Sequence, residues 1–265
     1  MPRLSLLCIV SFAAWSADLQ PAVERACAGK PAVAVVAEVR TGKLMAAFRP
    51  ELARSRAAPP GSALKPFTLA AWMDAHAGQQ PPVWPCPRQL RLAGRRLDCT
   101  HPMLAIPVDA PGAVAYSCNC WFAHLALDLK PAQLAHALHG IASQVSAALT
   151  AEDLQLQAIG EWGIELTPME LLSAYRKLAL RRAESALQPL FEGLEGAVAY
   201  GSAQLAAAPG LEVAGKTGTG KGHAWFAGFA PAQAPEIVVV VFLDQGRGGA
   251  DAAPIAGEIF RAYQP

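Results

Sequence analysis

The sequence predicts an α+β fold, in which an antiparallel sheet from N- and C-terminal strands is flanked by helices and joined to a mainly helical second lobe. Short β-type runs lie near the start of the chain and after residue 210, and helical patterns fill the stretch between them. With 265 residues, 53% of them hydrophobic and 16% charged, the chain can bury a large core as one domain, or as one lobe inserted in another.

The first strands form a predicted β-hairpin. Residues Ala32 to Val39 and Lys43 to Phe48 are mostly apolar, and Thr41-Gly42 between them suits a tight turn. A polar connection from Arg49 to Pro60 then leads the chain to the first helix. We therefore expect the sheet to begin here and the helical lobe to follow.

The middle of the chain has the pattern of a helical lobe. Pro66 falls in the first turn of its helix, where proline is tolerated. Thr150 to Asp153 carries a capping signal. The predicted helices are Ser62–His76, Ser117–Leu127, Lys130–Ala148, Thr167–Leu180 and Glu184–Gln204.

After Gly210, three apolar runs rich in β-branched or aromatic residues are separated by glycine and proline turns. They span Leu211–Thr219, His223–Ala230 and Glu236–Leu243, and we interpret them as consecutive antiparallel strands. A final helix from Ala253 to Tyr263 is expected to cover them. These strands would share one sheet with the N-terminal hairpin.

The N-terminus has the pattern of a secretory signal. An apolar run from Leu4 to Trp15 follows a basic start, and small residues precede a cut before Ala17. We expect residues 1–17 to be this signal, with a short N-terminal anchor as the alternative. Residues 18–265 would then form a single exported domain, periplasmic or otherwise extracytoplasmic.

Cysteines in an exported chain suggest disulfides. Cys86 and Cys99 flank a weakly alternating stretch with a glycine at its tip, and a hairpin there would bring the two thiols face to face, so we expect that bridge. If Ser117 begins a helix or a tight turn, the side chains of Cys118 and Cys120 diverge and would not bond to each other. A zinc site of these four residues is disfavoured because they include no Cys-x-x-Cys pair. Cys27 has no assigned role.

Three short segments carry the candidate chemistry, and the first contains Ser62 and Lys65. Three residues apart at the start of a helix, these two side chains would share one face within hydrogen-bond reach. The helix N-terminus and burial both disfavour a protonated amine, which would lower the pKa of Lys65 and let it accept the Ser62 proton. The pair is a candidate nucleophile and general base.

The second segment contains Ser117 and Asn119. Ser117 would approach from the second lobe and relay the proton to a leaving amine, while Asn119 would hold Lys65 or a substrate amide. Positions two apart diverge on a helix, so the pair would work best on a loop or in a first turn. In the simpler interpretation, the two side chains merely cap a helix.

The third segment, Lys216 to Thr219, is expected on an edge strand beside the cleft. Alternation would point Lys216 and Gly218 to one face, and Thr217 and Thr219 to the other. The Lys216 charge and the two hydroxyls suit a terminal carboxylate. Gly218 would let a substrate backbone pass closely. The backbone N–H groups of Ser62 and Thr219 are candidates for an oxyanion hole.

Two other functions are rejected from the sequence. Residues Gly215 to Gly222 nearly match a phosphate-binding loop, but Gly222 stands where Ser or Thr is required and a strand, not a helix, is predicted to follow. The net charge of +1, without a basic run, gives no case for nucleic-acid binding. No cofactor and no metal is predicted.

In their contexts the three segments resemble the motifs of the transpeptidase domain of penicillin-binding proteins, within the serine D,D-peptidase and serine β-lactamase superfamily. The segments are Pro60–Thr68, Tyr116–Asn119 and Gly210–Thr219, and the likeness spans roughly residues 30 to 265. The resemblance implies a peptidoglycan D,D-transpeptidase in which Ser62 attacks the D-alanyl-D-alanine bond of a stem peptide. It also implies that β-lactams acylate Ser62, and it leaves open a peripheral association with the membrane or with cell-wall machinery.

Three alternative functions remain open. A D,D-carboxypeptidase would pass the acyl group to water. The 99 residues from Ser117 to Lys216 leave little room for loops that would exclude water from the cleft, which favours this alternative. A serine β-lactamase needs a deacylating base, for which Glu161, Glu165 or a carbamylated Lys65 are the candidates. A non-enzymatic sensor of β-lactams or of the cell wall would keep its acyl-enzyme.

Overall fold

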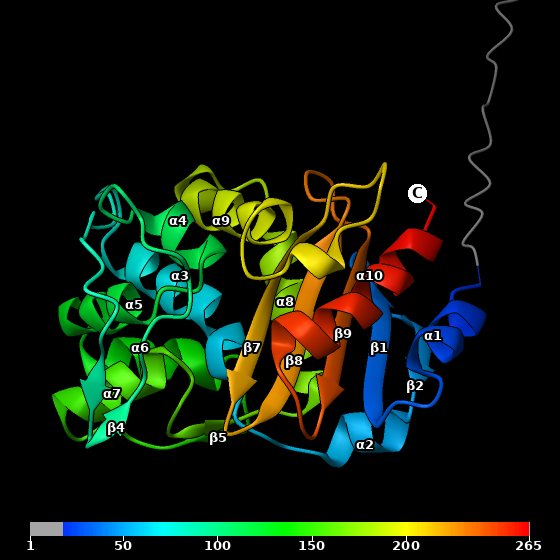
Figure 1. The fold of residues 1–265 in the computed structure, drawn as a ribbon, viewed down its shortest axis with the longest axis horizontal. Coiled ribbons are helices and arrows are strands. Elements are labelled where there is room, and N and C mark those ends of the chain that lie inside the picture. The colour runs from blue at the N-terminus through cyan, green and yellow to red at the C-terminus, as the bar shows by residue number, and fades with distance from the viewer. Residues whose placement is uncertain (1–17, 265) are drawn as a thin grey trace, which may run out of the picture.

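A five-stranded antiparallel sheet forms the centre of the computed structural model, which describes residues 18–264. The strand order is β2-β1-β9-β8-β7, so the N-terminal hairpin lies beside the C-terminal strands (Figure 1). Helices cover the sheet, and a mainly helical lobe stands beside its β7 edge (Figure 1). The predicted α+β fold is confirmed. The predicted signal at residues 1–17 lies outside the described residues.

The strands of this sheet follow the predicted runs closely, and they are β1 (Ala32–Glu38), β2 (Leu44–Phe48), β7 (Ala214–Gly220), β8 (His223–Ala230) and β9 (Ile237–Leu243). Strand β8 begins directly after the turn at Lys221 and Gly222, so the segment resembling a phosphate loop belongs to a hairpin. This agrees with the rejection of nucleotide binding, because a phosphate loop needs a helix at that point.

Both faces of the sheet are covered by helices, which explains why its strands are apolar on both sides. Val33 and Val35 of β1 belong to the core that contains α8 (Pro168–Leu180). Ala34 and Val36, which alternate with them, pack in the second core with α1 (Gln20–Cys27) and α10 (Ala253–Ala262).

The remaining helices are α2 (Pro50–Ser55), α3 (Lys65–Ala75), α4 (Ala110–Ala115), α5 (Asn119–Leu125), α6 (Pro131–His139), α7 (Ala151–Ala158) and α9 (Gln188–Ala199). A short 3₁₀ turn, η1 (Gly61–Leu64), precedes α3. No helix among residues 18–264 has the length and apolar character needed to cross a membrane.

Helix α6 is shorter than predicted, because tertiary contacts hold the residues that follow it. The prediction continued this helix to Ala148, but the structure ends it at His139. The backbone N–H of Ser143 donates to the Glu170 carboxylate, and β5 (Gln144–Val145) then pairs with β6 (Ile164–Glu165). The capping signal at Thr150 is confirmed as the start of α7.

The predicted hairpin between Cys86 and Cys99 exists, but the predicted disulfide does not. Strands β3 (Arg91–Leu92) and β4 (Arg95–Arg96) pair across a tip that contains Gly94. The two Sγ atoms lie 3.6 Å apart, whereas a disulfide needs about 2.05 Å. The bridge prediction is wrong because the hairpin brings the two thiols to a larger group of cysteines and not to each other alone.

At the start of η1, the backbone of Gly61 packs directly against the backbone of Gly160. The N–H of Gly61 donates to the carbonyl of Gly160 at 3.1 Å. Gly160 has φ +77, and a Cβ at this position would lie 2.1 Å from the carbonyl oxygen of Gly61. Only glycine permits both the left-handed backbone and this approach.

We expect Gly160→Ala to lower the free energy of unfolding by about 2–3 kcal/mol, because it adds a steric clash to backbone strain. Gly78→Ala is the matched control, since Gly78 has a similar φ of +82 and nothing within 4 Å of its would-be Cβ. Strain alone should cost this control about 1 kcal/mol. Urea unfolding of both variants measures the difference, and equal losses would contradict the role of the Gly61 contact.

Candidate active site

Ser62 lies on η1, at the junction between the sheet and the helical lobe. The carbonyl of Pro59 accepts a hydrogen bond from the Trp225 indole at 3.0 Å, and the carbonyl of Ala63 accepts one from the Tyr175 hydroxyl at 2.9 Å. Both donor side chains are fully buried. A strand of the sheet and a helix that covers it therefore hold the Ser62 segment on both sides.

Lys65 is the first residue of α3 and is completely buried. Its Nζ donates to the carbonyl of Ser117 at 2.7 Å, to the Ser117 hydroxyl at 3.3 Å and to Asn119 Oδ1 at 2.5 Å. Burial lowers the pKa of Lys65 to about 8. The predicted convergence of the first two segments on this amine is present.

Ser117 adopts a backbone conformation that is uncommon for serine. Its φ is 57, in the left-handed region, where it turns the chain between α4 and α5. Asn119 follows as the first residue of α5 and donates from Nδ2 to the carbonyl of Leu97 at 2.9 Å. Because Ser117 stands on the turn and not on the helix, both side chains can face Lys65. This is the loop arrangement that the spacing required.

Lys216 and Thr217 lie on β7, which is an edge strand of the five-stranded sheet as predicted. Both side chains are buried and contact the Ser202 hydroxyl, from Lys216 Nζ at 3.4 Å and from Thr217 Oγ1 at 3.2 Å. Burial, followed by the charge of Lys65, lowers the pKa of Lys216 well below its usual value. Lys65 and Lys216 are thus close enough to repel each other.

Gly218 has a packing role that the motif spacing did not predict. A Cβ at this position would lie 2.2 Å from the Pro60 carbonyl oxygen and 2.9 Å from the Ala63 Cβ. The glycine therefore makes room for the Ser62 segment, and its closeness to a substrate backbone stays a prediction. Thr219, the next residue, is exposed, and its hydroxyl accepts a hydrogen bond from the Gly248 N–H at 3.0 Å.

Sequence reasoning missed one side chain near these segments, and it named two carboxylates whose positions can now be described. Ser202 follows α9 and reaches the site only because its loop folds back to β7, so no local pattern marks it. Glu161 pairs with Arg95 of the hairpin at 2.7 Å. Glu165, the other candidate deacylating base, is exposed on β6.

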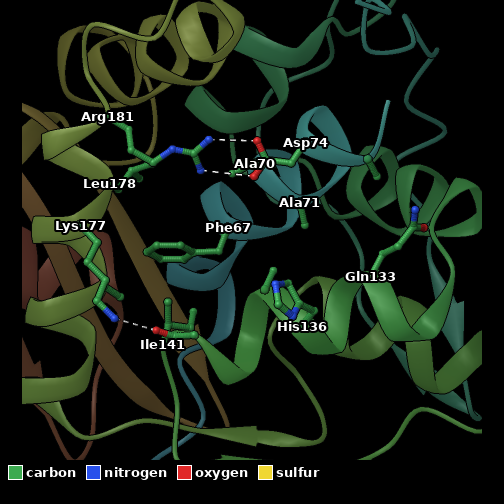
Figure 2. A pocket seen from close by; sticks show the side chains of 14 residues that line it. Phe67, Ala70, Ala71, Asp74, Gln133, His136, Ile141, Lys177, Leu178 and Arg181 are labelled. Atoms are coloured by element: carbon green, nitrogen blue, oxygen red, sulfur yellow. Dashed lines mark hydrogen bonds and ion pairs between the residues drawn. The ribbon is translucent and has the colours of Figure 1, made fainter. Parts of the chain in front are cut away.

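A pocket of about 490 Å³ lies elsewhere, between α3, α6 and α8 (Figure 2). The Phe67 ring points into it, and Arg181 pairs with Asp74 at its side (Figure 2). None of the predicted site residues lines this pocket. The candidate chemistry lies instead at the junction of η1, the Ser117 turn and β7, where the contacts of Lys65 and Lys216 are found.

The arrangement suits nucleophilic acyl transfer. It supplies a hydroxyl on a fixed turn, a buried amine with a lowered pKa one helical turn away, and a second hydroxyl bonded to that amine. Among the turn and loop hydrogen bonds of the described residues, none uses the N–H of Ser62, which leaves it available to an oxyanion.

Comparisons with known proteins point to one family. The family model for the penicillin binding protein transpeptidase domain matches residues 32–262. Peptidoglycan D,D-transpeptidase PbpA of Mycolicibacterium smegmatis is 29% identical over 262 residues, covering 74% of this chain and 53% of that protein. PbpA of Mycobacterium tuberculosis is 40% identical over 74 residues, covering 22% of this chain and 15% of that protein. The chain thus spans about half or less of these relatives.

Two solved structures share the fold. The D,D-transpeptidase domain of a peptidoglycan glycosyltransferase from Eggerthella lenta superposes with a TM-score of 0.77 at 20% identity, covering 92% of this chain and 80% of that one. A peptidoglycan glycosyltransferase from Burkholderia ambifaria gives a TM-score of 0.78 at 23% identity, covering 92% and 91%. With the family match over most of its length, this chain belongs to the penicillin-binding protein transpeptidase domain family.

Proposed function

We propose that this chain is a peptidoglycan D,D-transpeptidase that works through a serine acyl-enzyme and binds penicillin. Ser62 is the nucleophile, Lys65 the general base and Ser117 the proton relay. The single observation that carries the proposal is the buried Lys65 amine, bonded to Ser117 and Asn119 and one helical turn from Ser62. The names of the relatives support the same activity.

The reaction follows from these contacts. The neutral Lys65 amine takes the Ser62 proton as Ser62 Oγ bonds to the carbonyl carbon of the D-alanyl-D-alanine peptide. The C–N bond then breaks, and the proton passes through the Ser117 hydroxyl to the departing D-alanine amine. An amine of a neighbouring strand then attacks the acyl carbon, and the ester bond to Ser62 Oγ breaks. The proton that the amine loses returns to Ser62 Oγ.

Substrate binding is assigned to Asn119 and to β7. The Thr217 and Thr219 hydroxyls, with the Lys216 amine behind them, suit the terminal carboxylate of the stem peptide. Asn119 would hold the substrate amide beside Lys65, and the backbone of Gly218 would continue the edge strand. We also propose that the chain is exported, since peptidoglycan lies outside the cytoplasm, with residues 1–17 as its signal or anchor.

The environment of Glu161 supports acyl transfer over β-lactam hydrolysis. A deacylating base needs a free carboxylate near the ester, but Glu161 is committed to an ion pair with Arg95. Persistent acylation by penicillin is therefore expected, as for a penicillin-binding protein.

A fluorescent penicillin should form a long-lived adduct with the purified chain, and Ser62→Ala should abolish it, because the ester bond is made by Ser62 Oγ. Ser55→Ala is the control, since the Ser55 hydroxyl donates to the Glu51 carbonyl on α2, away from the candidate site. Gel fluorescence over time measures the adduct, and labelling that survives Ser62→Ala would refute the assignment. D-alanine release with and without an amine acceptor then separates transpeptidase from carboxypeptidase.

The rate of penicillin acylation should depend on the protonation of Lys65. With the pKa lowered to about 8, the neutral amine predominates above that pH, so the rate should fall about tenfold per pH unit below it and level off above it. Lys65→Ala should lower the rate by about 10²–10⁴ and remove this step. Lys177→Ala, on α8, is the control. Stopped-flow acylation between about pH 6 and 10 measures both, and a step near the ordinary lysine pKa of about 10.4 would contradict burial as the cause.

A further inference from the structure

Four thiols and one imidazole meet beside the Ser117 turn. The Sγ atoms of Cys86, Cys99 and Cys118 form a triangle with sides of 3.6, 3.7 and 3.3 Å. His101 Nε2 lies 3.5 Å from Cys86 Sγ, and Cys120 Sγ lies 3.5 Å from Cys99 Sγ. Except for Cys86, which is half-buried, all of these side chains are buried.

The spacing of these atoms matches the corners of a tetrahedral zinc site. Zinc–sulfur bonds of about 2.3 Å and zinc–nitrogen bonds of about 2.05 Å place tetrahedral ligands about 3.8 Å apart for two sulfurs, and about 3.6 Å for sulfur and nitrogen. The ligand atoms of Cys86, Cys99, His101 and Cys118 all lie within 4.8 Å of one another.

The surroundings prepare these atoms for a cation. His101 Nδ1 lies 2.8 Å from the Pro102 carbonyl, to which it can only donate, so the lone pair sits on Nε2 and faces the thiols. The backbone N–H of Cys120 donates to Cys99 Sγ at 3.4 Å, which stabilises a thiolate. In metal sites, residues that bind the ion typically make a further hydrogen bond of this kind to the protein.

Disulfides account for the cluster less well. Cys99 Sγ lies within 3.7 Å of three other sulfurs and could bond to only one of them. Every sulfur pair is more than 1 Å beyond bonding distance, since a disulfide measures about 2.05 Å. A disulfide also gives no reason for the His101 imidazole to face the thiols.

We propose that Cys86, Cys99, His101 and Cys118 bind one structural Zn²⁺. Three thiolates and an imidazole in a buried tetrahedron favour zinc over the oxygen-seeking Mg²⁺ and Ca²⁺, and four protein ligands close the site to substrate. The expected Cys-x-x-Cys pair is not needed, because the ligands come from the two ends of a hairpin and from a separate turn.

The ion would fasten the β3–β4 hairpin to the turn that carries the second motif. Cys118 lies between Ser117 and Asn119, and Asn119 already bonds to Leu97 of the hairpin at 2.9 Å. Ser117 and Asn119 are the contacts of the Lys65 amine. Zinc is therefore a positioning element for these two residues. Binding of the metal itself does not depend on the proposed function.

The test begins with metal content. The chain, purified without chelators, should carry about one zinc ion by mass spectrometry of the metal, and Cys99→Ser should weaken zinc affinity at least about 100-fold. Cys27→Ala is the matched control, because Cys27 is a buried free cysteine outside the cluster. Zinc retained in Cys99→Ser, or absent from a fully reduced wild-type chain, would overturn the proposal. So would a metal-free chain whose cluster cysteines are paired as disulfides.

A second measurement covers the case in which Cys99→Ser fails to fold. Co²⁺ added to the reduced, metal-free wild-type chain should give thiolate charge-transfer absorption and the intense visible bands of a tetrahedral site. Octahedral spectra would refute the ligand set. His101→Ala should weaken zinc binding while Cys120→Ser retains it, and the reverse result would exclude His101 as the fourth ligand.

Penicillin acylation adds a readout of positioning. Removing zinc from the wild-type chain should slow acylation of Ser62, and adding zinc back should restore it. This readout alone rests on the proposed function, so a chain that binds zinc stoichiometrically but never reacts with penicillin would refute the proposed function and leave the metal site standing. Unchanged acylation after verified zinc removal would overturn the positioning role.

Discussion

The burial of the Lys65 amine is the constraint on which the rest of the site depends. An ammonium group removed from water costs several kcal/mol unless polar groups replace its hydration. Here the replacements are the Ser117 carbonyl, the Ser117 hydroxyl and the Asn119 amide oxygen. All three come from the Ser117 turn and the first residue of α5, so the position of this short segment decides whether the amine is held, and how readily it gives up its proton.

The nucleophile depends on a different part of the molecule from its base. Contacts from Trp225 on β8 and Tyr175 on α8 hold the Ser62 segment, and Gly218 lets it lie directly against β7. The sheet therefore positions the hydroxyl, while the helical lobe positions the groups around the amine. Lys65 joins the two because it starts α3 directly after η1.

Much of this could be predicted from the sequence, because the motif spacings act locally. Ser62 and Lys65 share a helical turn whatever surrounds them, and the apolar runs mark β8 and β9 within a residue. What could not be predicted depends on chain segments meeting in space. Ser202 reaches Lys216 through a loop, and the residues that follow α6 leave the helix because Ser143 bonds to Glu170 on α8.

The cysteines and Gly218 show the same limit. Spacing rules recognise ligands that are neighbours in sequence, whereas the thiols here converge from a hairpin and a turn. At Gly218, a Cβ would meet the protein's own Pro60 carbonyl, which is a contact that motif spacing does not reveal. Ser117 carries a consequence of its own: its left-handed backbone, which glycine would adopt without cost, makes serine about 1 kcal/mol worse for folding. A glycine at position 117 would relieve this strain but would remove the hydroxyl, so the fold gives up stability to keep a group that contacts the Lys65 amine.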